Sequence, residues 1–153
     1  MQSETRDLRR HMDGGLYQAI GWARFWVSGE ENLDAETKAP VGAQILGVAK
    51  HSEDQSEITV FKAADGSLRY CFRQPSALPS RGALMIYQHL WPFEQSLWGR
   101  PAAQFAERFA PISSERAAEA MAGDRQAAQA TISQTRSRRR HQEKSREQDA
   151  FRR

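Results

Sequence analysis

Large aromatic residues are concentrated in the front part of this 153-residue chain. All four tryptophans, all three tyrosines and six of the seven phenylalanines lie within residues 1–112, and beyond them only Met121, Ile132 and Phe151 are large and apolar. A segment without large apolar side chains cannot bury enough surface to form its own core. The sequence therefore predicts a polar segment over 1–15, a folded β-rich domain over 16–112 and a helical or disordered tail over 113–153.

Charge is divided at the same place. Residues 113–153 carry ten Lys or Arg and six Asp or Glu, whereas the remainder carries 12 basic and 13 acidic residues. The basic residues concentrate at Arg136, Arg138, Arg139, Arg140, Lys144 and Arg146. Such density is typical of segments that bind phosphate backbones. It equally describes a solvated tail that keeps a protein soluble, and both interpretations stay open.

The strand-like pattern is densest between Gln44 and Phe109. Residues 16–27 and 57–63 are rich in β-branched and aromatic side chains, and Asp65-Gly66 between two such runs is a hairpin signal. Strands are expected over 16–27, 44–50, 57–63, 67–73 and 96–100, and 83–90 fits a strand or a helix. Helices are expected over 3–12, over 102–109 after Pro101, and over 117–134 with Ser113 or Ser114 as cap. Together these elements predict an α+β fold, in which a small antiparallel β-barrel or sheet is followed by a helix and a basic tail.

Two strings resemble a small bacterial family of SH3-like domains whose function is unknown. They are ILGVAKHSE, from Ile45 to Glu53, and LMIYQHLWPFEQSLWGRPAAQFAERF, from Leu84 to Phe109. Members of that family join the two strings almost directly, while this chain inserts residues 54–83. The resemblance implies a small SH3-like barrel, and it carries no catalytic residue over to this chain. The richness of the chain in alanine and arginine favours a bacterial origin.

The insertion itself looks like a partial internal duplication. Residues 58–61 correspond to 84–87 at an offset of 26, and Phe72 and Pro75 correspond to Trp98 and Pro101 at the same offset. Only the prolines are identical at these positions, so chance similarity is the competing explanation.

Few residues point to catalysis. His51 beside Glu53 fits a general base oriented by a carboxylate, although the same residues are typical of a polar turn between strands. Cys71 with His51 or His89 fits a thiol–imidazole pair, although a lone cysteine on a strand more often behaves as a small apolar residue. With one cysteine and scattered histidines, no metal spacing is present, and no cofactor is predicted.

Trp22, Trp26, Trp91 and Trp98 fit either a platform for a base or peptide, with Trp91 the most exposed, or a filled core. The preferred function is a non-enzymatic cytoplasmic binding module, associated with nucleic acid of low sequence specificity through the six tail residues named above. The alternatives are a small hydrolase or nucleotide-handling enzyme using His51 and Glu53, and an adaptor whose tail helix docks a protein partner through Ala117, Met121 and Ala128. No membrane partner is expected, and the oligomeric state is open.

Overall fold

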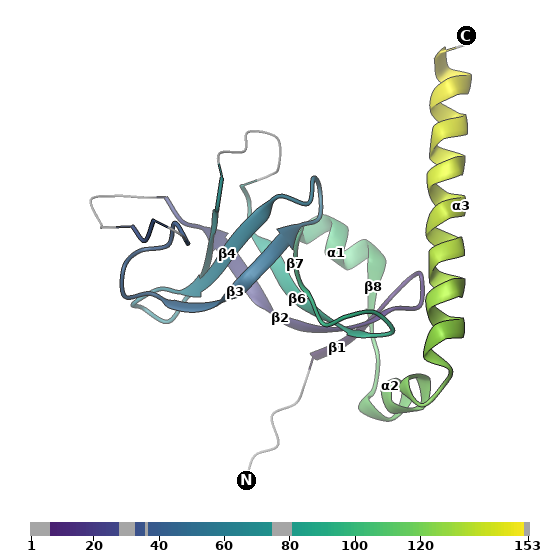
Figure 1. Cartoon of the computed structure of the whole chain (residues 1–153), viewed down its shortest axis with the longest axis horizontal. Helices are drawn as coiled ribbons and strands as arrows, with labels where there is room; N and C mark the ends of the chain where they lie inside the picture. Colours follow the sequence, from purple (N-terminus) through teal and green to yellow (C-terminus); the bar gives the residue numbers. More distant parts are fainter. Residues whose placement is uncertain (1–6, 28–32, 36, 75–80, 152–153) are drawn as a thin grey trace.

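The computed structural model describes residues 7–27, 33–35, 37–74 and 81–151. These residues form eight strands and three helices (Figure 1). The elements are β1 (Asp7–His11), β2 (Leu16–Phe25), β3 (Gln44–His51), β4 (Glu57–Lys62), β5 (Leu68–Phe72), β6 (Leu84–Trp91), β7 (Leu97–Pro101), α1 (Ala102–Arg108), β8 (Phe109–Pro111), α2 (Ser114–Met121) and α3 (Arg125–Phe151).

Six of the described strands close into a barrel in the order β2-β5-β4-β3-β7-β6. The ten-residue β2 makes this possible, because one of its edges pairs with β6, while the other pairs with β1 over its first residues and with β5 at its end, at Arg24 and Phe25. Strands β1 and β8 extend the sheet beyond the closed part. The expected strands are confirmed, and the ambiguous run 83–90 is a strand. The expectation of an antiparallel barrel is wrong in one respect, since β2–β5 and β3–β7 are parallel pairs.

The barrel consists of two equivalent halves, β2-β6-β7 and β3-β4-β5. In both halves the first strand pairs with the second in the same register, and equivalent residues lie 26 positions apart in the sequence. Ala23 opposes Leu84 in one half as Ala49 opposes Ile58 in the other. Register shifts also fall at equivalent places, between Ala19 and Gly21 in β2 and between Ile45 and Gly47 in β3. The correspondence expected for residues 58–61 and 84–87 is therefore a structural equivalence.

The third strands are equivalent at a different offset. Ile58 pairs with Phe72 as Leu84 pairs with Pro101, so β5 matches β7 at an offset of 29. The expected match of Phe72 with Trp98 is thus wrong by three residues, and Pro75 lies outside the described residues. The inserted residues 54–83 contain β4 and β5, two of the three strands of the second half.

The barrel interior reflects this equivalence. Its buried core comprises Ala23, Ala49, Ile58, Val60, Tyr70, Leu84 and Ile86. Three pairs of these residues occupy equivalent positions in the two halves, whereas the position of Tyr70 in β5 is taken by Gly99 in β7. A Cβ on Gly99 would lie 3.1 Å from both Ile58 Cδ1 and Leu84 Cδ1, so the small residue in one half leaves room for the packed interior. Tyr70 also donates a hydrogen bond to the Gly82 carbonyl at 2.7 Å.

Two satellite clusters flank the barrel. On one side Tyr17, Tyr87, Phe105 and Phe109 pack between the sheet and α1, with Phe105 and Phe109 stacked at 4.5 Å between ring centroids. On the other side the segment around Ala39 covers a second cluster formed with Phe61 and Cys71. The short strand β8 and the strand β1 belong to the first side, and neither was expected.

The N-terminal prediction needs correction. Residues 7–11 form β1 rather than a helix, because Arg9 and Arg10 pair with both β2 and β8 in antiparallel register. Residues 3–6 of the expected helix lie outside the described residues. The segment after β1 is a turn, in which Asp13 Oδ1 accepts the Gly15 amide at 3.0 Å.

The C-terminal region forms two helices rather than one. Ser113 caps α2, its Oγ accepting the Arg116 amide at 3.2 Å, as expected. The first helix ends before Gly123. Asp124 Oδ1 then accepts the Ala127 amide at 3.1 Å and caps the start of α3. Ala117 and Met121 lie in α2 and Ala128 in α3, so these residues do not form the single docking stripe that was expected.

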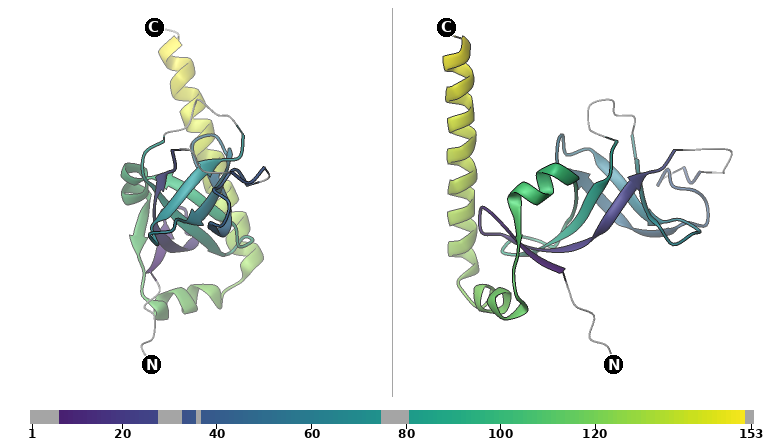
Figure 2. Two further views of the ribbon diagram at one scale, coloured as in Figure 1. Left: turned by 90° about the vertical axis from the view of Figure 1, so that its left-hand side faces the viewer. Right: turned by 180° about the vertical axis from the view of Figure 1, so that it is seen from behind.

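The long helix α3 is docked rather than frayed where it passes the barrel. Arg125, Gln129, Ile132 and Arg136 recur at helical spacing on one face. Arg125 Nε and Gln129 Nε2 donate to the Pro92 carbonyl at 2.6 and 2.7 Å, and Ile132 is buried. Figures 1 and 2 show this helix standing beside the β1–β2 turn, with its C-terminal end projecting past the barrel.

Candidate nucleic-acid interface

A cleft of about 700 Å³ lies where the barrel meets α3. Its walls come from the β1–β2 turn, the turn after β3, strands β6 and β7, the end of α1, and α3. The lining residues are His11, Asp13, Tyr17, Ser52, Glu53, Gln55, Tyr87, Trp98, Arg100, Arg108, Phe109, Arg136, Arg139 and Arg140. Five arginines therefore face two carboxylates, and aromatic rings line the same space.

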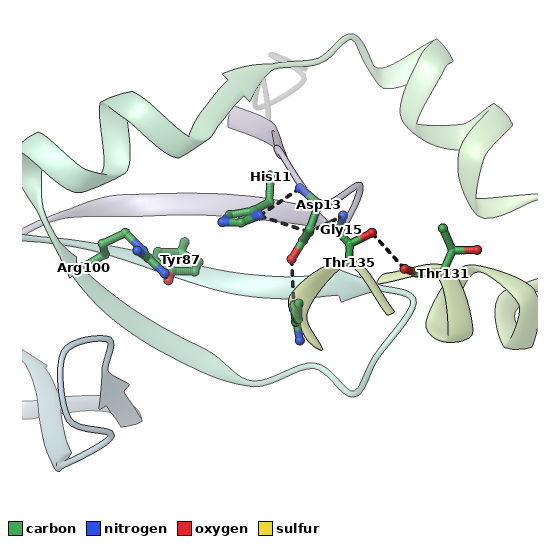
Figure 3. Close-up of polar contacts among 8 residues, drawn as sticks. His11, Asp13, Gly15, Tyr87, Arg100, Thr131 and Thr135 are labelled. Carbon is green, nitrogen blue, oxygen red and sulfur yellow. Dashed lines mark hydrogen bonds and ion pairs between the residues drawn. The ribbon is translucent and has the colours of Figure 1, made fainter. Parts of the chain in front are cut away.

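Asp13 holds the two walls of the cleft together (Figure 3). Its carboxyl is 1% exposed, and Oδ2 accepts from Arg136 Nε at 2.9 Å. Oδ1 lies 3.0 Å from His11 Nδ1 and 3.0 Å from the Gly15 nitrogen. Burial by itself would raise the pKa of Asp13, but the contacts with His11 and Gly15 and the hydrogen bond from Arg136 outweigh it. The pKa of this carboxyl therefore lies well below its ordinary value, and Asp13 is ionised at neutral pH.

His89 fixes the turn on which α3 rests. Its Nε2 accepts the Phe93 amide at 2.9 Å, and its ring packs edge-on against Tyr17 at 4.5 Å. Burial, reinforced by the positive charge of Arg136, lowers the pKa of His89 to about 4. The imidazole is therefore neutral at physiological pH and acts as an acceptor. Arg136 also lies over the Phe93 ring, with its Cζ 5.2 Å from the centroid.

The six basic tail residues have three different environments. Arg136 is tied to Asp13, while Arg139 and Arg140 face the cleft. Arg138 and Lys144 are exposed on α3 away from the cleft lining, and the Arg146 side chain lies outside the described part of the chain. Arg136 therefore has a partly structural role, whereas Arg139 and Arg140 are available to a ligand.

The catalytic candidates suggested by the sequence do not meet in one site. His51 is fully buried, its ring stacked on Phe72 at 6.2 Å, and its Nδ1 accepts the Glu53 amide at 3.2 Å. Glu53 lines the cleft, which His51 does not. Cys71 lies in the Phe61 cluster with Sγ 3.7 Å from the Thr37 carbonyl. Burial raises the pKa of this thiol to about 11, which disfavours the nucleophilic thiolate.

The tryptophans do not form one platform. Trp22 is the most exposed, at 49%, and not Trp91 as expected. Trp26 packs in the Phe61 cluster, while Trp98 packs beside Tyr87 and lines the cleft. Only one of the four therefore stands next to the arginines.

Comparison of the two barrel halves shows where the chain has specialised. At equivalent positions, Tyr87 and Arg100 line the cleft where the other half has Phe61 and Cys71. Those two residues belong to the apolar cluster covered by the Ala39 segment. The two halves therefore share a register here and differ in polarity, and the half that lines the cleft is the polar one.

His11, Asp13, Arg100 and Arg108 were not identified as site residues from the sequence. The available signal was His11-Met12-Asp13-Gly14-Gly15, which places a histidine and an aspartate on one turn. That signal becomes informative only when residues 7–11 are known to be a strand. Within the described residues, no group of three His, Cys, Asp or Glu side chains is arranged to hold a metal ion.

No helix in the described ranges combines the length and apolar character needed to cross a membrane. Comparison with known proteins gives no relative from which a function could be transferred. No family model, curated protein or solved structure matches this chain.

Proposed function

We propose that the protein binds single-stranded nucleic acid, with backbone phosphates in the cleft between the barrel and α3. The observation that carries the proposal is the convergence of arginines from three elements: Arg100 from β7, Arg108 from α1, and Arg139 and Arg140 from α3. Guanidinium groups suit phosphate because their planar donors match its oxygens. Only the fold brings these residues together, since they span more than 30 positions of the sequence.

Aromatic side chains beside the arginines favour a single strand. The tail itself has no interleaved aromatics, but the barrel supplies Tyr87, Trp98 and Phe109 to the same cleft. Positive grooves with neighbouring aromatic rings are the usual means of holding unpaired bases. A volume of about 700 Å³ is in the range of small-ligand pockets, so it fits one or two nucleotides better than a duplex.

Two further features agree with this role. Ser52 Oγ is buried at the cleft and has no hydrogen-bond partner among the described residues, so a phosphate oxygen would satisfy it. Beyond the cleft, the exposed Arg138 and Lys144 continue the positive charge along α3. The resemblance to SH3-like domains and an accessory role in the cytoplasm are also part of this proposal. A small barrel of that kind is compatible with a binding function.

Fluorescence anisotropy with a labelled 20-mer tests the proposal. The ligands are single-stranded RNA, single-stranded DNA and duplex DNA, each titrated between 50 and 300 mM salt. Four arginines that face the cleft without the Asp13 contact predict a slope of log K against log salt of roughly −3 for a single strand, at about 0.7 for each phosphate neutralised.

The matched variants are R139A/R140A in the cleft and R24A/K62A on exposed strand positions outside it. Both remove two charges. The cleft variant is expected to lower the salt slope by roughly 1.4 and to weaken binding at least tenfold, while the control changes little. Equal losses in the two variants, or absence of single-strand binding at 50 mM salt, would overturn the proposal.

A further inference from the structure

We infer that the cleft selects guanine, with the Glu53 carboxylate as the group that recognises the base. This inference rests on the proposed function, because it concerns the same cleft and adds the base that the cleft prefers. It is carried by a carboxylate that a well-bonded turn presents beside an aromatic ring and an arginine. Phosphate binding alone has no use for a negative charge at that place.

The turn after β3 is fixed by its own hydrogen bonds. The His51 amide donates to the Ser56 carbonyl at 2.9 Å, and the Gln55 amide donates to the His51 carbonyl at 2.8 Å. The Glu53 amide donates to His51 Nδ1 at 3.2 Å. The backbone of the turn is therefore held in one conformation, from which Ser52, Glu53 and Gln55 line the cleft.

A hydrogen bond to β7 sets where this turn lies. The Ser52 amide donates to the Gly99 carbonyl at 2.9 Å. Gly99 stands between Trp98 and Arg100 in the sequence, and both of these neighbours line the cleft. Glu53 thus directly follows the residue that is bound to β7 between an aromatic ring and a guanidinium.

The β1–β2 turn has the same construction, and its carboxylate has a different use. In each turn a histidine Nδ1 accepts the amide of the second residue on, which is Asp13 at 3.1 Å in one and Glu53 at 3.2 Å in the other. The Asp13 carboxyl is 1% exposed and accepts from Arg136 Nε at 2.9 Å. Glu53 is exposed and lines the cleft. The first carboxylate therefore holds α3 in place, whereas the second faces the space where a ligand lies.

Guanine suits a carboxylate better than the other bases do. An ionised carboxylate only accepts hydrogen bonds, and its two oxygens bind paired donors that point in one direction. Guanine presents two such donors side by side on its Watson–Crick edge, N1–H and N2–H. Adenine and cytosine each present an amino group beside a ring nitrogen that is an acceptor, and uracil presents N3–H between two carbonyl oxygens. Those acceptors repel a carboxylate, so guanine is the base that matches Glu53.

The lining of the cleft is divided by charge in a way that suits a nucleotide. The arginines come from β7, α1 and α3, whereas the turn after β3 contributes a hydroxyl, a carboxylate and an amide. Phosphates are therefore expected beside α1 and α3, and the base beside the turn. Trp98 also lines the cleft and offers a ring on which the base stacks.

Fluorescence anisotropy of the full chain with five labelled RNA pentamers, UUXUU, tests the inference at low salt. X is guanosine, inosine, adenosine, cytidine or uridine. Wild-type protein is expected to bind the guanosine strand at least about fivefold more tightly than the adenosine, cytidine and uridine strands, which is the lower end of what a bidentate contact to a base contributes. Inosine keeps N1–H but lacks the N2 amino group, so its strand should lose most of that advantage.

E53Q keeps the size of the side chain and replaces one acceptor oxygen with a donor. It is expected to bind all five strands within about twofold of one another, since the bidentate contact is lost. It should bind the uridine strand no more weakly than wild type does, whereas a merely structural role of Glu53 would weaken the binding of every strand. E94Q is the matched control, because Glu94 is exposed in the β6–β7 turn outside the cleft lining. It loses the same charge and should keep the preference for guanosine.

The outcomes separate this inference from the proposed function. Strands that bind wild-type protein with equal affinity overturn the inference and leave the binding role standing, whereas absence of binding overturns both. A preference for another base, an inosine strand that binds as tightly as guanosine, a guanosine preference that persists in folded E53Q, or uniform weakening in E53Q also overturns the inference. If E53Q fails to fold, the wild-type comparison of guanosine with inosine still decides whether the paired donors are recognised.

Discussion

Replacing Asp13 with asparagine should loosen α3 from the barrel. Asparagine keeps an oxygen that can accept the Gly15 amide, but it loses the charge that receives Arg136 Nε at 2.9 Å. A hydrogen bond to a charged group contributes about 1.5–3 kcal/mol. The Arg136 side chain is 40% exposed, so it can turn toward water and recover part of that energy. We therefore expect D13N to lower the free energy of unfolding by about 2 kcal/mol, or roughly 30-fold in the equilibrium constant.

Urea denaturation measures this loss, and amide hydrogen exchange shows where it acts. Exchange should accelerate over the docked part of α3, residues 125–136, and stay unchanged in β3 and β4. The matched control is D7N, because Asp7 is half exposed and its ion pair with Arg9 lies on the surface. Such pairs contribute about 0–1 kcal/mol.

The contribution of Asp13 to the free energy of unfolding should also depend on pH. The folded-state pKa of Asp13 lies below its unfolded value of 3.8, so its contribution is fully present above about pH 4. It is lost as the pH falls further. If D13N is as stable as D7N at pH 7 and α3 exchanges at the wild-type rate, the account of how this helix is held is refuted.

Three further predictions follow from buried groups. The pKa of His89 is about 4 in the folded protein and 6.5 in the unfolded chain, so the free energy of unfolding should be highest above pH 6.5 and should fall by about 2 kcal/mol by pH 5. H89Q should flatten that part of a pH series of urea titrations, and an unchanged pH profile in H89Q would contradict the prediction. I132A should cost about 2 kcal/mol in the same assay, since it empties a buried contact between α3 and the Gly14 turn; a loss below that of the exposed substitution M121A would count against docking. Cys71, with its raised pKa, should react with iodoacetamide at pH 7.4 only after unfolding, and labelling of the native protein at the rate of free cysteine would be inconsistent with its burial.

The barrel strands were predictable because their signals are local. Runs such as residues 57–63 combine β-branched residues, aromatics and a following Asp-Gly turn, and they fold as the pattern indicates. The short strands β1 and β8 were missed because their sequences, DLRRH and FAP, have no such pattern. β1 is a strand because β2 extends past the barrel and offers it an edge, and β8 then pairs with the other edge of β1.

The cleft could not be predicted for a different reason. The tail was expected to be an appendage because it has no apolar core, and Ile132 is its one buried large apolar residue among those described. Its docking depends mainly on polar contacts to the barrel, such as Arg136 to Asp13 and Gln129 to the Pro92 carbonyl. Hydrophobic periodicity does not report contacts of that kind. The sequence shows that the tail is rich in arginine. Only the fold shows that the tail arginines lie in the same cleft as Arg100 and Arg108.

Photocrosslinking of a single-stranded RNA that carries 4-thiouridine tests the central claim most directly. The cleft predicts crosslinks to Tyr87, Trp98 and the α3 segment 135–140, lost on adding unlabelled RNA and reduced in R139A/R140A. Crosslinks confined to the face around Trp26 and Phe61, or to α3 beyond His141 alone, would show that the cleft is not where the strand binds.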